Sequence, residues 1–215
     1  MHLKRQKVPK SWPIHRKGTK YVVRPTFNIK NGVPVLIFLR DMLKVAQNRK
    51  EVKIALHNKH VLLNDKPVKN EKNSILLFDK INLVPAKKYY NLSLSEHGKF
   101  EAEEIKESEA HQKITKIINK KILKNKKTQL NLIDGINSIS EIKCAMSDSI
   151  IFDFKQKKII KVLQLKEKSK VIVFAGKHTG KKGTIKKINS EKKMVELDFN
   201  GEKISVLIKQ LMIIE

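Results

Sequence analysis

The chain is short of acidic side chains, and this shortage is the first guide to its partners. Twenty-one Asp and Glu residues stand against 47 Lys and Arg residues in a chain of 215, which leaves a formal net charge of +26. A surface this basic attracts polyanions, because lysines placed at phosphates release condensed counterions. Nucleic acid is therefore the first partner class to consider, and a membrane surface is the rival polyanion.

Long apolar runs, cysteine pairs and metal-ligand clusters are missing as well. The longest uncharged apolar runs, such as residues 35–39, are far too short to span a bilayer, and no apolar segment follows the basic N-terminus as in a signal peptide. The single cysteine, Cys144, excludes an internal disulfide and fits a reduced cytosolic setting. Without a Cys/His cluster, we expect no metal site and no cofactor.

Arginine is scarce and confined to one end of the chain. Only five of the 47 basic residues are arginine, and all lie within the first 49 residues: Arg5, Arg16, Arg24, Arg40 and Arg49. A drift of composition toward Lys, Ile and Asn explains the lysine excess equally well, but it does not explain this position. Because arginine makes forked, planar contacts with phosphates and base edges, the most geometry-dependent RNA contacts are predicted to be N-terminal.

Residues 1–34 predict a basic N-terminal arm. The segment holds nine Lys or Arg residues, no acid and no helical period, so it is not expected to build a core. Aromatic residues are interleaved with the charge: Trp12, Tyr21 and Phe27. They could stack on unpaired bases or hold the arm against the protein's own surface. The arm residues expected to contact RNA are Lys4, Arg5, Lys7, Lys10, Trp12, Arg16 and Lys17.

Residues 35–68 predict two short helices and a tight hairpin. Apolar side chains recur at helical spacing over residues 35–47: Leu36, Leu39, Leu43 and Ala46. Asn48 then predicts the N-cap of a second helix, with Glu51 at the reciprocal position of a capping box. The hairpin is predicted to turn at Asn64-Asp65, since both residue types tolerate positive φ.

Basic residues follow one side of this helix-helix-hairpin segment. Arg49, Lys53 and His57 lie one turn apart on the second helix and form an outward stripe without an acid. Such a stripe is most often a solvated helix face, but the adjacent hairpin makes it a candidate RNA grip. The expected contacts here are Arg40, Lys44, Arg49, Lys50, Lys53, His57 and Lys66.

Residues 99–168 predict a central α/β domain. Five glutamates between positions 101 and 109 precede a predicted helix with Ile114, Ile117 and Ile118 inside. Its expected outer face holds four lysines: Lys113, Lys116, Lys120 and Lys124. Acids near a helix start and lysines near its end suit the helix dipole, so the glutamates are interpreted as structural. Short strands follow, with a turn at Asp134-Gly135.

Residues 169–215 predict a small antiparallel barrel. Four short apolar strands are expected, separated by turns that include Asn189-Ser190 and Asn200-Gly201: residues 171–174, 183–188, 194–199 and 203–208. The predicted fold class is therefore α+β with several domains: an arm (1–34), an RNA-binding module (35–98), a central domain (99–168) and a barrel (169–215).

Two segments resemble known RNA-associated motifs. Residues 34–68 resemble the S-four-type RNA-binding module, or alpha-L motif, which also occurs in some pseudouridine synthases and a tyrosyl-tRNA synthetase. Residues 173–185, Val-Phe-Ala-Gly-Lys-His-Thr-Gly-Lys-Lys-Gly-Thr-Ile, resemble a KOW motif in an SH3-like barrel. The loop lacks the spacing of a Walker A motif. The barrel residues expected to touch RNA or a neighbouring protein are Lys177, His178, Thr179, Lys181 and Lys182.

The order of arm, module, central domain and KOW barrel resembles the archaeal and eukaryotic "four-e" family of small-subunit ribosomal proteins over essentially the whole chain. Residues 2–5, 9–12 and 35–40 match its N-terminal pattern. Asp65 departs from it, since related hairpins usually have glycine there, and the loop before Asp79 lacks the usual glycine. Longer members continue with a basic tail, so contacts made by that tail are not expected here.

The resemblance implies a structural constituent of the cytoplasmic ribosome that binds small-subunit ribosomal RNA beside neighbouring ribosomal proteins. Neither a membrane partner nor a homo-oligomer is expected. An RNA-modifying enzyme is the first alternative, but too little chain remains for a catalytic domain. A KOW-containing transcription elongation or regulatory factor is the second, and it would bind protein in nuclease-treated lysate.

Overall fold

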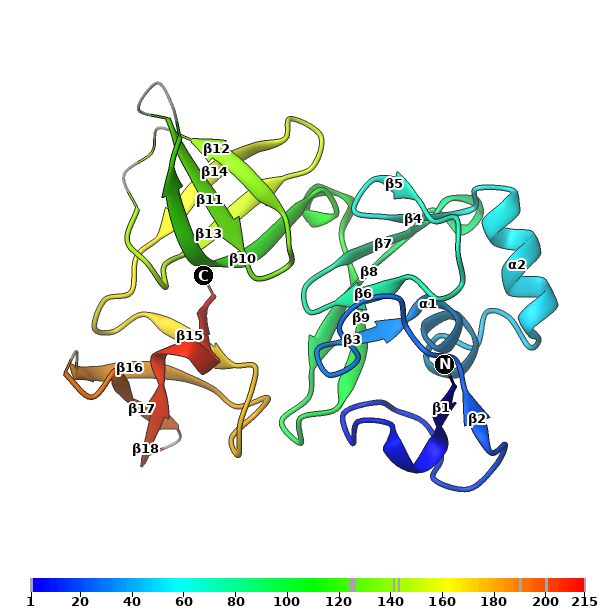
Figure 1. The fold of residues 1–215 in the computed structure, drawn as a ribbon, viewed down its shortest axis with the longest axis horizontal. Coiled ribbons are helices and arrows are strands. Elements are labelled where there is room, and N and C mark those ends of the chain that lie inside the picture. The colour runs from blue at the N-terminus through cyan, green and yellow to red at the C-terminus, as the bar shows by residue number, and fades with distance from the viewer. Residues whose placement is uncertain are drawn as a thin grey trace. The chain divides into compact units, whose positions relative to one another are not determined.

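The computed structural model describes residues 2–123, 127–140, 142, 144–189, 191–199 and 201–214, which form mostly strands with few helices, as in an α+β fold. The chain divides into two compact units (Figure 1). The N-terminal unit comprises Met1–Ser95 and Lys99–His111, and the C-terminal unit comprises Glu96–Gly98 and Gln112–Glu215. Three positions used in the predicted helix and turns lie outside the described residues: Lys124, Ser190 and Asn200. The finer division into four named domains stays a prediction.

A five-stranded antiparallel sheet is the frame of the N-terminal unit. Its order is β5-β4-β7-β8-β9. The strands are β4 (Val61–Leu63), β5 (Lys66–Pro67), β7 (Lys80–Leu83), β8 (Lys88–Leu94) and β9 (Phe100–Ile105). Two short antiparallel pairs accompany it: β1 (Leu3–Lys4) with β2 (Tyr21–Val22), and β3 (Gly32–Pro34) with β6 (Ser74–Leu76). The sheet's apolar face includes the fully buried Leu92.

Two helical segments precede the sheet. α1 (Val35–Ile37) continues as a π-helical turn (Phe38–Met42), and α2 spans Arg49–His57. The first helix is shorter than predicted, because Lys44 adopts a φ of 55° and ends it before Ala46. The predicted capping box is confirmed: Glu51 accepts hydrogen bonds from the backbone N–H groups of Gln47 at 2.7 Å and of Asn48, and the first of these is the main cause that lowers the pKa of Glu51.

The arm is folded onto this unit. Leu3 and Trp12 are buried, and the backbone N–H of Phe100 donates to Ser11 O at 2.8 Å. Residues 1–34 were not expected to build a core, and the structure corrects this for Leu3 and Trp12, which are buried; for Trp12 the alternative of packing on the protein holds. An apolar residue can join a core through a single contact, without any periodic pattern around it, and a pattern search misses such residues.

The C-terminal unit contains two five-stranded antiparallel sheets. The first has the order β12-β11-β10-β13-β14 and the second the order β18-β17-β16-β15-β19. The first sheet is built from β10 (Gln112–Ile122), β11 (Thr128–Leu132), β12 (Asn137–Ser140), β13 (Ser149–Asp153) and β14 (Lys158–Leu163). The second is built from β15 (Lys170–Val173), β16 (Lys182–Asn189), β17 (Met194–Phe199), β18 (Glu202–Leu207) and β19 (Leu211–Ile213). The strands predicted in residues 171–208 and the turn at Asp134-Gly135 are confirmed.

The predicted helix after residue 112 is wrong. This segment is the eleven-residue strand β10, which pairs with β11 on one side and β13 on the other. Isoleucines three and four residues apart also fit a strand that is bulged at Ile118, and β-branched residues favour strands. Lys113 and Lys116, predicted outside, are 1% and 4% exposed. The glutamates before them form β9 and a 3-10 turn (Glu107–Glu109) instead of a helix start.

Candidate nucleic-acid interface

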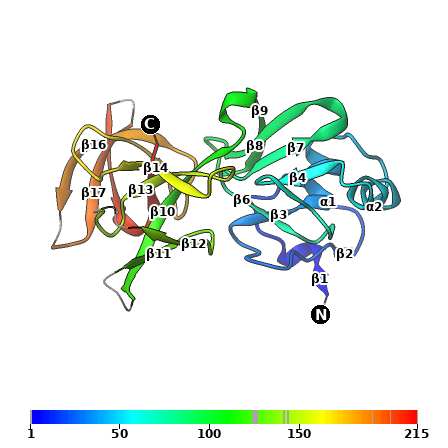
Figure 2. The ribbon, with the colours of Figure 1, turned by 90° about the horizontal axis from the view of Figure 1, so that it is seen from above.

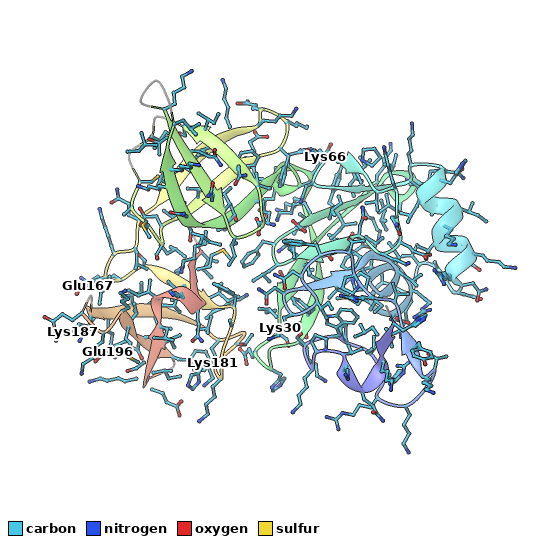
Figure 3. The ribbon with its side chains drawn as sticks, viewed as in Figure 1. Lys30, Lys66, Glu167, Lys181, Lys187 and Glu196 are labelled. Atoms are coloured by element: carbon cyan, nitrogen blue, oxygen red, sulfur yellow. The ribbon has the colours of Figure 1, made fainter. Side chains whose placement is uncertain are left out.

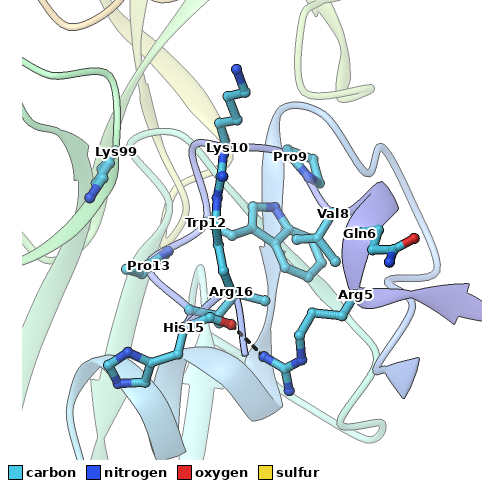
Figure 4. Close-up of a pocket in the computed structure, with 11 residues that line it drawn as sticks. Arg5, Gln6, Val8, Pro9, Lys10, Trp12, Pro13, His15, Arg16 and Lys99 are labelled. Carbon is cyan, nitrogen blue, oxygen red and sulfur yellow. Dashed lines mark hydrogen bonds between the residues drawn. The ribbon is translucent and has the colours of Figure 1, made fainter. Parts of the chain in front are cut away.

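The arm and the first helix share a groove in the N-terminal unit. This hollow of about 630 Å³ brings Lys17 of the arm together with Arg40 and Lys44 of the predicted module. A second hollow of about 880 Å³ adjoins it along Arg5 and is lined by Lys10, Arg16 and Lys99, among others (Figure 4). Basic residues that are distant in sequence thus meet on one surface. Lys99 is an addition that sequence reasoning missed, because no basic pattern surrounds it.

Arg5 holds the arm together from within. Its guanidinium donates to Thr19 O at 2.8 Å, to His15 O at 2.6 Å and to the Thr19 hydroxyl at 2.9 Å, and Figure 4 shows the contact to His15. Three of its five N–H groups are therefore occupied by the loop that it closes. Arg5 positions the neighbouring Arg16 and Lys17, which are exposed.

Of the three aromatic residues of the arm, Trp12 is the packed one. Its side chain is 3% exposed, so the packing alternative describes it, while Tyr21 and Phe27 are 48% and 53% exposed. The Lys20 ammonium lies 5.6 Å from the centre of the Tyr21 ring. An exposed ring beside a cation is available to stack on a base, so Tyr21 is a better candidate for stacking than Trp12.

Both arginines of the predicted module are paired with carboxylates. Arg40 donates twice to the Asp41 carboxylate, at 3.0 and 2.9 Å. Arg49 forms an ion pair with Glu71, whose side chain is 5% exposed, and this hydrogen-bonded guanidinium lowers the pKa of the Glu71 carboxyl. Glu71 is far from α2 in sequence, so the helix pattern alone did not reveal it. Half of the Arg49 side chain nevertheless stays exposed.

Most of the remaining basic residues of the predicted interface are open to solvent. Many are lysines on the arm, α2, the hairpin tip and the β15–β16 loop, and Figure 3 labels one of them, Lys66. The exposed members are Lys4, Lys7, Lys10, Arg16, Lys17, Lys44, Lys50, Lys53, His57, Lys66, Lys177 and Lys182. None of them forms an ion pair within the described part of the chain. They are free to meet phosphates.

Side-chain contacts hold the hairpin tip against the rest of the N-terminal unit. Asn64 and Asp65 adopt φ values of 50° and 62°, which confirms the predicted turn. The Asn64 side chain donates to Asp79 at 2.7 Å, and Asp65 contacts His111 Nδ1 at 2.8 Å. Asp65 thus lies against the protein, and its neighbour Lys66 is the exposed charge. In the loop before Asp79, Phe78 adopts a φ of 62°, a left-handed conformation that favours glycine.

The β15–β16 loop is held by its own hydrogen bonds. Thr179 donates from its hydroxyl to Gly176 O at 2.6 Å, so this hydroxyl is already used. Gly176 has a φ of 98°. A Cβ atom at Gly183 would lie 2.6 Å from the backbone oxygen of Asp198, so glycine is required by close strand approach. Lys181 lies over the Phe199 ring at 4.5 Å, and with His178 and Thr179 it is partly buried.

The part of the chain that the structure describes contains neither a candidate metal site nor a candidate membrane-spanning helix. No three His, Cys, Asp or Glu side chains there come together in a way that could hold a metal ion. No described helix is long and apolar enough to cross a membrane.

Comparison with known proteins first gives the class of fold. The structure resembles the crystal structure of the 30S ribosomal protein S4e from Thermoplasma acidophilum with a TM-score of 0.74, 23% sequence identity and coverage of 86% of this chain and 95% of that chain. The chain therefore shares the fold of that structure, which is built from several small β-rich parts.

Sequence comparison then gives the family. The family model described as Ribosomal family S4e matches residues 86–159, and the RS4NT (NUC023) domain model matches residues 1–27. The small ribosomal subunit protein eS4 of Methanothermobacter thermautotrophicus is 36% identical over 191 residues, which covers 87% of this chain and 79% of that protein. The Methanocella arvoryzae eS4 protein is 36% identical over 190 residues, with coverage of 87% and 80%. The chain belongs to the S4e family.

Proposed function

We propose that this chain is a structural protein of the small ribosomal subunit, not an enzyme, that binds ribosomal RNA and supports subunit assembly and translation in the cytoplasm. Its relatives are named for the small ribosomal subunit, and the alternative of a transcription factor gains nothing from them. The observation that carries the RNA-binding part is the shared groove of the arm and first helix, where Lys17, Arg40 and Lys44 line one surface. Neighbouring ribosomal proteins are the other partners, without a membrane, a cofactor or a second copy of the chain.

The proposed RNA surface runs from the arm across the groove to α2 and the hairpin tip. Lys10, Arg16 and Lys17 supply the arm's charge, and Lys50, Lys53 and His57 supply that of α2. Lysines act here as phosphate contacts, which fix position without reading sequence. A-form RNA helices hide their base edges in a deep, narrow groove, so specificity comes mainly from the shape of the RNA. Unpaired bases that stack on the Tyr21 ring add to it.

Residues 35–98 act in this proposal as the S-four-type module and residues 169–215 as the KOW barrel. The exposed Lys177 and Lys182 beside the constrained loop give the barrel a second basic contact, which adds affinity more than register. Figure 3 labels Lys181 of this loop. Because its ammonium already lies on Phe199, Lys181 is expected to contribute less than its neighbours.

The test is a salt titration of RNA binding. Lys17→Glu with Lys44→Glu should weaken binding to a small-subunit rRNA transcript by about tenfold or more, and should reduce the slope of log affinity against log salt by roughly two. The matched control is Lys155→Glu with Lys158→Glu, two exposed lysines of the C-terminal unit. Equal losses in both variants would mean that net charge alone binds RNA. In cells, the protein should sediment with the small subunit and leave it only at high salt.

A further inference from the structure

The N-terminal unit is polarised in charge. Exposed lysines lie on the arm and on α2, whereas five exposed glutamates gather on β9 and the turn after it, where they outnumber the exposed Lys99 and Lys106. Figures 1 and 2 show α2 and β9 at opposite ends of this unit. The glutamates are Glu101, Glu103, Glu104, Glu107 and Glu109. In a chain of net charge +26, such a local reversal of sign would repel RNA phosphates rather than attract them.

The strand that carries this charge ends its sheet. β9 is last in the order β5-β4-β7-β8-β9 and pairs with β8 alone. At its start, the N–H of Phe100 points away from β8 and donates to Ser11 O. By alternation, the backbone groups of Ala102 and Glu104 also point outward. Among the described residues, no backbone group outside the sheet bonds to either of them.

The side chains beside this open edge form a group of acceptors. Glu101 and Glu103 share one face of the sheet, since they are in register with Ser93 and Asn91 of β8. Asn91 is 8% exposed, and its side-chain oxygen has no donor among the described residues. A carboxylate pair beside an unpartnered amide oxygen calls for a donor-rich cation.

Exposed Lys99 precedes Glu101 by two residues and Lys106 follows the strand, but neither forms an ion pair with Glu101 or Glu103 in the described part of the chain. Glu104, on the opposite face, lies 3.5 Å from Lys88, and Glu107 is hydrogen-bonded to Tyr89. Lys80 of β7 is in register with Asn91, but it is two strands from the edge. Neither Glu101 nor Glu103 forms an ion pair with another described residue.

We propose that the β9 edge binds an extended, Lys- or Arg-bearing segment of a neighbouring protein by strand addition. The added strand would bond to the outward backbone groups of Ala102 and Glu104, and two basic side chains spaced two residues apart would meet Glu101 and Glu103. A second copy of this chain fits badly, because two β9 edges would bring glutamates together. The assignment of the partner as a neighbour in the subunit rests on the proposed function; the edge and its chemistry do not.

The test uses a synthetic eight-residue peptide of alternating Arg and Val with the full chain. Two matched peptides serve as controls: one replaces Arg by Glu, and one keeps Arg but carries N-methyl groups on the bonding edge. The Arg peptide should bind in calorimetry and should slow hydrogen exchange at the amides of Ala102 and Glu104. Weaker binding of the N-methyl peptide, by about tenfold, would support strand pairing over charge attraction alone.

Variants then locate the site. Glu101→Lys with Glu103→Lys should weaken the Arg peptide by about tenfold or more, because attraction becomes repulsion. Glu191→Lys with Glu202→Lys, at exposed positions of the C-terminal unit, carries the same charge change and should leave binding unchanged. Three outcomes would overturn the proposal. The two double variants could lose affinity for the Arg peptide equally, the N-methyl peptide could bind as tightly as the Arg peptide, or the amides of Ala102 and Glu104 could exchange as fast with the peptide as without it. The Glu101/Glu103 variant should lose no affinity for rRNA, because the change adds positive charge, so this assay fails separately from the proposed function.

Discussion

Lys116 donates a 2.7 Å hydrogen bond from Nζ to the backbone oxygen of Leu211, which is 95 residues further along the chain. The same ammonium also bonds to Ile208 O. Nearby, the backbone N–H of Ile213 donates to the Ser149 hydroxyl at 3.0 Å. These bonds join the central sheet to β19 and the turn before it within the C-terminal unit, so the two sheets are coupled through one buried lysine.

The buried ammonium should make the C-terminal unit more stable in mild alkali. Burial lowers the pKa of Lys116 from 10.5 to about 8, while the unfolded chain keeps its ordinary value. Between these values the unfolded state binds the extra proton, so the unfolding free energy rises with pH from about 8 to 10.5. Below pH 8 both states are protonated and the group adds no slope. The full gain should be about 3 kcal/mol, and denaturant unfolding across this pH range would measure it.

Lys116→Met separates the charge from the packing. At pH 7 the change removes the desolvation cost of a buried ammonium, which stabilises the folded state. It also leaves two carbonyl oxygens without a donor, which destabilises it, so stability at pH 7 should change little. The rise in stability above pH 8 should disappear. Lys158→Met, at an exposed lysine of β14, should retain it. A Lys116→Met protein that still gains stability in alkali would assign the slope to another group.

Arg49→Ala should act on the fold, whereas Lys53→Ala should act on RNA binding. The Arg49 guanidinium neutralises a buried carboxylate, and its loss should cost the N-terminal unit about 1–3 kcal/mol, a range reduced because half of its side chain is in water. Lys53 is exposed and unpaired in the described structure, so its removal should leave the melting temperature within about a degree. Melting curves and filter binding of both single variants check the division.

The pH profile adds a second check on Arg49. Because this arginine lowers the pKa of Glu71, the stability that the pair supplies is present above the ordinary carboxyl value of 4.5 and is lost as pH falls through the lowered one. Arg49→Ala should therefore lose less stability than the unmodified protein on acidification below pH 4.5. Parallel acid profiles for the two proteins would contradict this role.

Local sequence signals predicted the elements whose causes are local. The Asn48–Glu51 cap and the Asn64-Asp65 turn are determined by residues within a few positions, and short β-branched runs marked most strands of the C-terminal unit. The sequence does not distinguish helix from strand in the segment of β10, because its isoleucines fit both a helical and a bulged-strand spacing. Only its pairing with β11 and β13 decides between them.

Partners that are distant in sequence could not be predicted, because only the folded chain brings them together. Lys113 pairs with Asp134 at 2.7 Å, and Lys116 meets carbonyl oxygens more than 90 residues away, so both lysines looked solvated in sequence. Arg49 likewise looked free until the fold placed Glu71 beside it. For the lysine positions without a partner among the described residues, the sequence-based assignment of an RNA contact stays a prediction.

Asp65→Gly should have different effects on stability in two backgrounds. Glycine suits the left-handed φ of 62° better than aspartate, by roughly 0.5–1 kcal/mol, but it removes the contact with His111. In His111→Phe, where that contact is already gone, Asp65→Gly should stabilise the protein. In the unmodified chain the gain should shrink or reverse. Unfolding free energies of the four proteins form a double-mutant cycle, and a coupling of zero would show that the contact contributes nothing.

Trp12→Ala should destabilise the N-terminal unit by about 3–4 kcal/mol, because it empties the volume of a side chain that is only 3% exposed. Tyr21→Ala, at a ring that is 48% exposed, should change stability by less than about 1 kcal/mol and should instead weaken RNA binding. Thermal melting and filter binding of the pair distinguish the two roles. Should Trp12→Ala melt like the unmodified protein, the arm would be a separable RNA-binding extension, as its sequence alone suggests, and the burial of Trp12 would contribute little to the folded state.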